Sequence, residues 1–200
     1  QTCSAGSRVL IQENIYDEVT EELAQRFRKL KVGGPQNNPD CGPIITRKQF
    51  EYVNKFKNDC IDDGIPLIAE GDFSPGLDDG GFYIKPALFG PVPTSHKLAT
   101  EEVFGPVLAA IPFKDEQDAV SIANGTDYGL VASVWTENGS RQQRMAQQID
   151  TGQIFINCYG AGGGVELPFG GVRGSGHGRE KGFLALEEFS NTKTIVHKYQ

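Results

Sequence analysis

Short apolar runs and longer amphipathic stretches alternate along the first three quarters of the chain. Runs of apolar and β-branched residues predict strands at 8–12, 65–69, 82–84, 107–111, 130–135 and 153–157. Apolar positions at helical spacing predict helices at 14–30, 46–60, 115–123 and 140–149. Strands that alternate with helices are typical of an α/β fold. We therefore expect three layers, with an open, twisted and largely parallel sheet between helices on both faces.

Polar residues support the predicted starts of three of these helices. Asn14 suits the N-cap of the first helix, and Asp17 lies where a carboxylate offsets the positive end of the helix dipole. Thr46 and Gln49 have the spacing of a capping box at the start of the second helix. Asp115 suits the N-cap of the third.

The alternation stops at residue 158, and a glycine-rich stretch runs to residue 182. A loop of this length inside a compact domain is usually functional or disordered. Residues 192–199 alternate again and suit an edge strand, which pairs within its own sheet or with another chain. No internal repeat or interior linker is visible, so we expect one domain over 1–190 and a projecting strand over 191–200.

Composition excludes several classes of protein. The 200 residues carry a formal net charge of −7, which argues against a nucleic-acid-binding protein. No apolar run approaches the ~20 residues of a membrane-spanning helix, and the first residues lack the features of a secretory signal. The four cysteines are widely spaced without a Cys-x-x-Cys pair, so we expect no metal site. These features predict a cytoplasmic protein that binds neither membranes nor nucleic acid.

Cys3 is the first candidate for chemistry. It lies among small and polar residues ahead of the first predicted strand, in a turn-prone stretch where backbone amides are able to face a ligand. Such surroundings favour the thiolate, which is the nucleophilic form of cysteine. The alternative is a small buried side chain, and position alone leaves both interpretations open.

Glu102 and Phe104 form a second candidate, two residues apart before a Gly-Pro turn. In extended backbone their side chains point the same way. A carboxylate beside a ring is able to hold sugar hydroxyls while the ring packs on a flat heterocycle. A solvated acid next to a core phenylalanine explains the pattern equally well.

The glycine-rich loop offers weaker signals. Residues 168–178 allow the backbone to approach a ligand closely, but no strand and helix of the Rossmann kind flank them as a phosphate site requires. His177 stands between glycines and suits an exposed loop histidine, so we assign it no role.

Four motifs, taken in order and spacing, closely resemble the aldehyde dehydrogenase superfamily over the whole chain: QTCSAGSR at 1–8, EEVFGP at 101–106, NCY at 157–159, and PFGG at 168–171 continuing through Arg179 and Glu180. By that resemblance Cys3 is the catalytic nucleophile. It attacks an aldehyde to give a thiohemiacetal and, after hydride transfer to NAD or NADP, a thioester that water hydrolyses.

The resemblance also implies roles for other residues. Glu102 matches the glutamate on the nicotinamide ribose, and Phe104 matches the aromatic residue beside the nicotinamide. Three residues match positions in the family's substrate pocket: Thr2, Ser4 and Phe169. Two others, Arg179 and Glu180, match a buried polar network that supports the site. The family's bulky entrance residues are replaced at 160–165 by a glycine-rich stretch, which predicts a wide or mobile mouth.

The chain resembles the family's C-terminal catalytic domain, beginning just before the nucleophile. By this resemblance the Rossmann-type cofactor domain and the glutamate general base are absent from it, so we expect the isolated chain to be inactive. Residues 191–200 match an oligomerisation strand, which implies a homodimer or homotetramer acting on a small-molecule aldehyde. The alternative is an assembly domain that keeps the fold and subunit interface without turnover.

Overall fold

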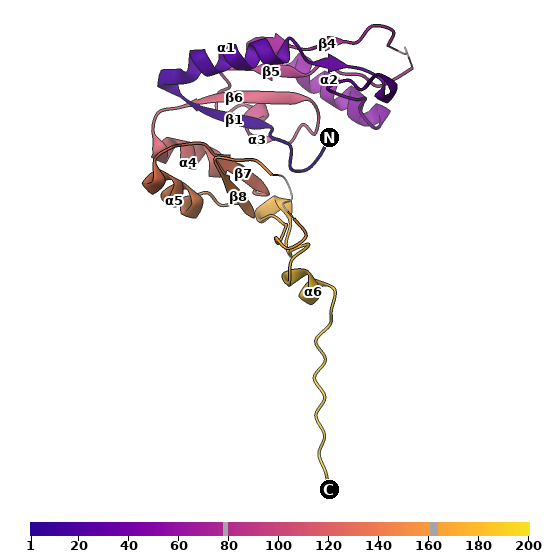
Figure 1. Cartoon of the computed structure of the whole chain (residues 1–200), viewed down its shortest axis with the longest axis vertical. Coiled ribbons are helices and arrows are strands. Elements are labelled where there is room, and N and C mark those ends of the chain that lie inside the picture. The colour runs from indigo at the N-terminus through magenta and orange to yellow at the C-terminus, as the bar shows by residue number, and fades with distance from the viewer. Residues whose placement is uncertain (78–79, 161–163) are drawn as a thin grey trace. The chain divides into compact units, whose positions relative to one another are not determined.

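A computed structural model describes residues 1–77, 80–160 and 164–200 (Figure 1). Its contacts divide the chain into two compact units, Gln1–Thr126 and Asp127–Gln200. The sequence predicts one domain over 1–190, whereas the contacts separate two units within that stretch. The assignment of 1–190 as a single catalytic domain stays a prediction.

The first unit is built on a four-stranded sheet. Its strands follow the order β1 (Arg8–Gln12), β6 (Val107–Phe113), β5 (Ala87–Phe89) and β3 (Leu67–Glu70). The β1–β6 and β6–β5 pairs are parallel, and only β5–β3 is antiparallel. The largely parallel sheet predicted from the sequence is therefore confirmed.

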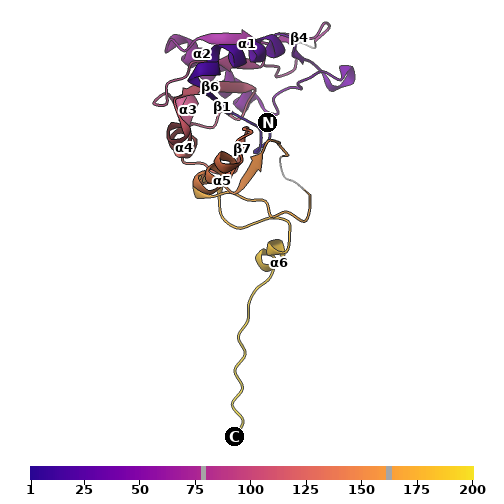
Figure 2. The same ribbon diagram turned by 60° about the vertical axis from the view of Figure 1, so that its left-hand side comes forward.

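Helices cover both faces of this sheet (Figures 1 and 2). One buried cluster joins α1 (Tyr16–Phe27) to Leu88 and Ala110. The other joins α2 (Arg47–Asp62) to Phe89 and Ile111, which directly follow Leu88 and Ala110 along their strands. Successive strand residues thus enter opposite layers, as expected of a parallel sheet that is buried on both faces.

Shorter elements complete the first unit. Strands β2 (Lys31–Val32) and β4 (Asp72–Phe73) pair in parallel. The remaining elements are two 3₁₀ turns and two helices, Glu13–Ile15, Pro35–Asn37, α3 (Lys97–Thr100) and α4 (Glu116–Asn124).

The second unit contains a parallel pair, β7 (Val131–Val134) and β8 (Gln153–Ile156), connected through α5 (Gly139–Gln148). Beyond β8, the described part of the glycine-rich stretch contains a 3₁₀ turn at Arg173–Ser175, and the short helix α6 (Leu184–Glu188) follows it. The strand–helix–strand order matches the expectation from the sequence.

Two local predictions are wrong. Asn14 does not cap the first helix, because it lies inside the 3₁₀ turn and the N-cap is Ile15, with no side-chain hydrogen bond. Residues 82–84 form no strand; the sheet instead takes Ala87–Phe89. Phe82 stacks on Phe50, with ring centroids 5.7 Å apart, so its apolar side chain serves packing against α2.

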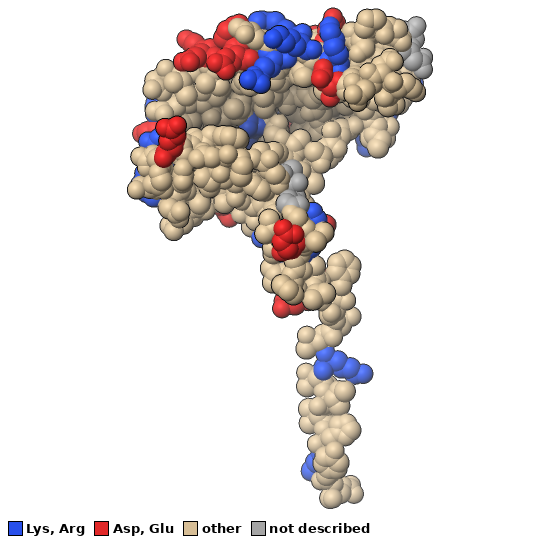
Figure 3. All heavy atoms as spheres, in the orientation of Figure 1, with Lys and Arg blue, Asp and Glu red and all other residues tan. Residues whose placement is uncertain are grey.

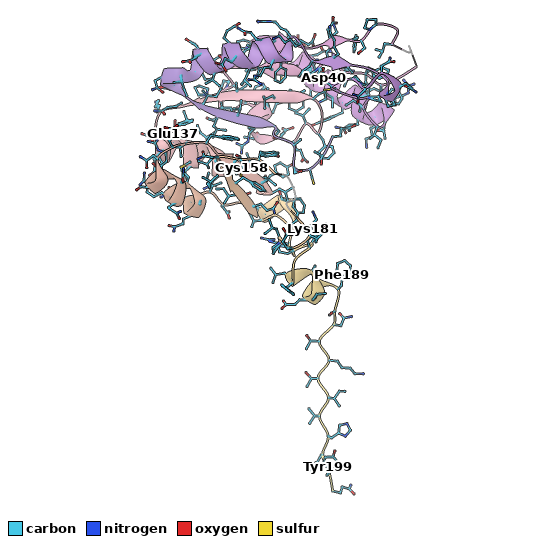
Figure 4. The ribbon with its side chains drawn as sticks, viewed as in Figure 1. Asp40, Glu137, Cys158, Lys181, Phe189 and Tyr199 are labelled. Carbon is cyan, nitrogen blue, oxygen red and sulfur yellow. The ribbon has the colours of Figure 1, made fainter. Side chains whose placement is uncertain are left out.

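The C-terminal residues 191–200 adopt neither helix nor strand within the described chain, and every side chain there is exposed. They continue beyond α6 as an extended segment, which Figure 4 shows from Phe189 to Tyr199. Figure 3 shows its surface as mostly uncharged, interrupted by basic side chains. The predicted strand does not form in the chain alone, and its role in oligomerisation stays a prediction.

Candidate functional site

Cys3 lies in a turn just ahead of β1. The Ala5 amide donates to the Thr2 carbonyl at 3.0 Å, which closes the turn around Cys3 and Ser4. Cys3 is exposed, whereas Ser4 is only 9% exposed. The turn therefore presents Cys3 to solvent, and the alternative of a small buried side chain is wrong.

The other cysteines have different environments. Cys60 is fully buried in the α2 cluster, and burial raises the pKa of its thiol to about 11. Burial also raises the pKa of the half-buried Cys41 thiol, with Asp40 adding to the effect. Cys158 is exposed at the end of β8 (Figure 4), where its carbonyl accepts from the Ser133 hydroxyl at 2.7 Å.

The segment that carries Glu102 and Phe104 connects α3 to β6. Between these two residues, Val103 is 5% exposed and belongs to the α2 cluster, whereas both flanking side chains are exposed. As predicted from the sequence, the side chains of Glu102 and Phe104 are on the exposed side, and the residue between them is buried. The backbone is not simply extended, because Phe104 has a φ of 51° in the left-handed region.

The sheet topology brings the Cys3 turn and this segment to the same end of the sheet, where β1 and β6 both begin. β1 and β6 are parallel neighbours, with Arg8 opposite Ala109, and the Ala109 amide donates to the Ser7 carbonyl at 3.0 Å. Cys3 precedes Arg8 by as many residues as Phe104 precedes Ala109. Both segments thus lie beyond the amino ends of paired strands.

The start of α2 and the residue just before its N-cap contact the two segments. The Gln1 side-chain oxygen accepts from the Ile45 amide at 2.9 Å, next to the N-cap Thr46. The Gln49 side-chain amide donates to the Val103 carbonyl at 2.8 Å and to the Phe104 carbonyl at 3.2 Å. One helix end therefore supports both parts of the candidate site.

The exposed acid and ring suit a nicotinamide nucleoside. No residue that the structure describes forms a hydrogen bond or ion pair with the Glu102 carboxylate, so its oxygens are available to accept from sugar hydroxyls. Phe104 is 38% exposed, and an exposed aromatic ring is able to pack against a flat heterocycle. The residues present thus fit the nicotinamide nucleoside that the family resemblance implies for them.

The predicted pocket and network residues divide between the two units. Thr2 and Ser4 belong to the Cys3 turn, whereas Phe169, Arg179 and Glu180 lie in the second unit. Phe169 and Glu180 exchange two backbone hydrogen bonds of 2.7 Å. The Arg179 guanidinium donates to the carbonyls of Gly171 and Gly178 at 2.8 and 2.7 Å, and so fixes the loop.

Glu180 has an exposed side chain in the described chain, whereas the resemblance places it in a buried polar network. The roles of the second unit's residues at a site stay predictions. The proposed entrance at 160–165 falls partly on 161–163, which lie outside the described residues; Gly160, Gly164 and Val165 are exposed.

Neither an arrangement of metal ligands nor a helix of membrane-spanning apolar length is present among the described residues. No group of three or more His, Cys, Asp or Glu side chains there has an arrangement that would hold a metal ion. No helix over the described ranges is both long enough and apolar enough to cross a membrane.

Sequence patterns alone do not identify the contribution of Gln49. Its spacing from Thr46 predicts a capping box, and the Thr46 hydroxyl does accept from the Gln49 amide at 3.2 Å. The Gln49 side chain, however, extends to Val103 and Phe104 instead of returning to the helix start. The partners lie more than fifty positions away, so no local signal indicates them.

Comparison with known proteins gives a consistent result. The model of the aldehyde dehydrogenase family matches residues 1–195. The chain is 38% identical to an aldehyde dehydrogenase of Emericella nidulans over 99% of its own length and 39% of that protein's.

Solved structures similar to this chain are also assigned as aldehyde dehydrogenases. A Burkholderia cenocepacia protein assigned as an aldehyde dehydrogenase superposes with a TM-score of 0.94 at 57% identity, covering 97% of this chain and 41% of that one. Mycobacterium tuberculosis aldehyde dehydrogenase complexed with NAD+ gives 0.90 at 38% identity, covering 99% and 41%. The chain thus spans about two fifths of the length of these relatives.

Proposed function

The chain belongs to the aldehyde dehydrogenase family, and from that premise we propose that it is the C-terminal catalytic portion of an NAD(P)-dependent aldehyde dehydrogenase. The enzyme oxidises a small aldehyde to a carboxylic acid. One observation carries the proposal. Cys3 is exposed just before the amino end of β1, and the exposed Glu102 and Phe104 lie before the amino end of the neighbouring parallel strand β6.

In this proposal Cys3 is the nucleophile. Its thiolate sulfur forms a bond to the aldehyde carbon while the carbonyl electron pair moves to oxygen, which gives a thiohemiacetal. The Cys3 backbone amide is the donor that this chain offers to the oxyanion. Oxidation leaves the acyl group on the sulfur as a thioester, and water then releases the acid and restores the thiol.

Glu102 and Phe104 orient the cofactor in this proposal. When bound, a nicotinamide cofactor supplies the hydride acceptor. The Glu102 carboxylate accepts hydrogen bonds from the ribose hydroxyls, and the Phe104 ring packs beside the nicotinamide. Relatives complexed with NAD+ support a nicotinamide cofactor for this chain. Orientation matters because a misplacement of about 1 Å is able to cost about 10²-fold in rate.

Glu102→Gln in the complete protein tests the cofactor role. The amide keeps the size of the side chain but weakens its hydrogen bonds to hydroxyls, since the carboxylate accepts more strongly. We expect hydride transfer in a single turnover to slow more than aldehyde binding weakens. An unchanged single-turnover rate would remove Glu102 from the cofactor site.

The remaining roles belong to the same proposal. Thr2, Ser4 and Phe169 contribute to the aldehyde pocket, and Arg179 and Glu180 support it. The exposed, extended residues 191–200 supply the strand that joins a second subunit in a homodimer or homotetramer. The cytoplasmic location and the inactivity of the isolated chain stay predictions.

A further inference from the structure

The backbone that carries Phe104 depends on outside support. A φ of 51° places this residue in the left-handed region, where a side chain with a Cβ is disfavoured. Residues in such conformations persist only where the surrounding structure holds them. The contacts that hold Phe104 therefore determine where its ring and the neighbouring Glu102 lie.

Gln49 makes two of these contacts. Its side-chain nitrogen donates to two successive carbonyls, those of Val103 at 2.8 Å and Phe104 at 3.2 Å. A carboxamide has two N–H donors, so these two bonds use its donor capacity. The Gln49 backbone is itself fixed, because its amide donates to the Thr46 cap at 3.2 Å.

Another contact lies one helical turn further along α2. A Cβ added at Gly105 would meet Val53 Cγ2 at 2.6 Å, so the segment lies directly against this fully buried valine. Gln49 and Val53 are four residues apart and therefore share one face of α2. The helix thus holds the segment by a pair of hydrogen bonds and by close packing.

We propose that Gln49 is a positioning residue for the cofactor contact, because its amide fixes the carbonyls on either side of the left-handed Phe104. The inference rests on the proposed function, in which Phe104 and Glu102 face the cofactor. No hydrogen bond joins Gln49 to residues 1–7 in the described structure. We therefore expect reactions of Cys3 that need no cofactor to change little when Gln49 is replaced.

The experiment compares two variants of the complete protein. Gln49→Glu keeps the shape of the side chain but removes both N–H donors, and Gln49→Leu removes the polar group. The matched control is Gln25→Leu, which changes an exposed glutamine on α1 that bonds only to Glu21 within the described structure. Circular dichroism and the melting temperature establish that each variant folds.

Three readouts separate positioning from folding. We expect kcat for NAD(P)+-dependent aldehyde oxidation to fall about 10- to 100-fold in both Gln49 variants, as a displacement of up to about 1 Å predicts. Hydrolysis of p-nitrophenyl acetate by Cys3 without cofactor should stay within about twofold of the wild type, as should both activities of the control. Amide hydrogen exchange in residues 101–107 should accelerate about fivefold, as the loss of about 1 kcal/mol of hydrogen bonding predicts.

Two results would overturn the proposal. One is a cofactor-dependent rate within twofold of the wild type in both Gln49 variants. The other is an equal loss of both activities, which would mean that Gln49 only supports the fold. A wild-type protein that oxidises no aldehyde with either cofactor would instead contradict the proposed function, while the exchange measurement would still establish or reject the contact of Gln49 with the segment.

Discussion

Alanine in place of Gly105 tests whether contact with α2 sets the position of the 101–106 segment. The added Cβ would lie 2.6 Å from Val53 Cγ2 and 2.8 Å from Cγ1. Carbon atoms in ordinary contact are about 3.5–4.0 Å apart, so the two groups must separate by roughly 1 Å. Val53 is fully buried, and a β-branched side chain in a helix keeps one rotamer. The segment, not the helix, therefore moves.

The size of this movement sets the expected effect. Overpacking of this kind costs about 1–3 kcal/mol of stability. A shift of about 1 Å at Phe104 is expected to lower the cofactor-dependent rate by up to about 10²-fold. Cofactor-independent esterase activity at Cys3 should change little, because Cys3 lies in a separate turn ahead of β1.

A double variant identifies the cause. Val53→Ala removes both Cγ atoms and leaves the Cβ of residue 53 at 3.3 Å from the new Cβ of residue 105. We expect the double variant to recover most of the rate lost in Gly105→Ala. Gly139→Ala is the control, because a Cβ there meets nothing within 4 Å. A wild-type rate in Gly105→Ala, or a double variant no better than Gly105→Ala alone, would mean that contact with Val53 does not set the position of the segment.

Three further predictions concern reactivity and stability. Cys3 should react with iodoacetamide fastest and Cys60 slowest, because Cys60 is buried and the pKa of its thiol is raised to about 11; peptide mass spectrometry gives the order, and equal or slower labelling of Cys3 counts against its role. Burial raises the pKa of Tyr16 from 10.0 to about 12, so above pH 10 the unfolded chain loses a proton that the folded chain keeps, and stability falls between pH 10 and 12. Urea unfolding of Tyr16→Phe should show a smaller fall over that range, and an identical fall would exclude Tyr16 as the cause. Thr46→Ala removes the cap of α2 and should cost about 1 kcal/mol in the same assay, whereas an unchanged midpoint would mean that the cap adds nothing.

Much of the fold follows from local patterns in the sequence. The cap at Thr46 and the cap at Asp115 form as predicted, because a side-chain oxygen near its own helix start meets the amide three residues on. Strand β1 has the predicted bounds, Arg8–Gln12. At Asn14 the prediction fails because a 3₁₀ turn takes up the residue that was expected to cap α1.

Contacts between distant residues were not predictable in the same way. The choice between 82–84 and Ala87–Phe89 as a sheet strand depends on whether Phe82 packs against Phe50, which no single short run reveals. Likewise, the motif at 101–106 identified Glu102 and Phe104 through resemblance to a family, but not the left-handed φ of Phe104. That conformation depends on Gln49, which only the folded chain brings close.

Trapping the acyl group on Cys3 tests whether this thiol is the nucleophile that attacks the aldehyde. The complete protein is mixed with an aldehyde and NAD(P)+, quenched in acid before the thioester hydrolyses, and digested for mass spectrometry. We expect an acyl adduct on the peptide that contains Cys3 and none on any other cysteine, together with loss of both adduct and oxidation in Cys3→Ala. Aldehyde oxidation that continues in Cys3→Ala, or an adduct on a different residue, would contradict this role of Cys3.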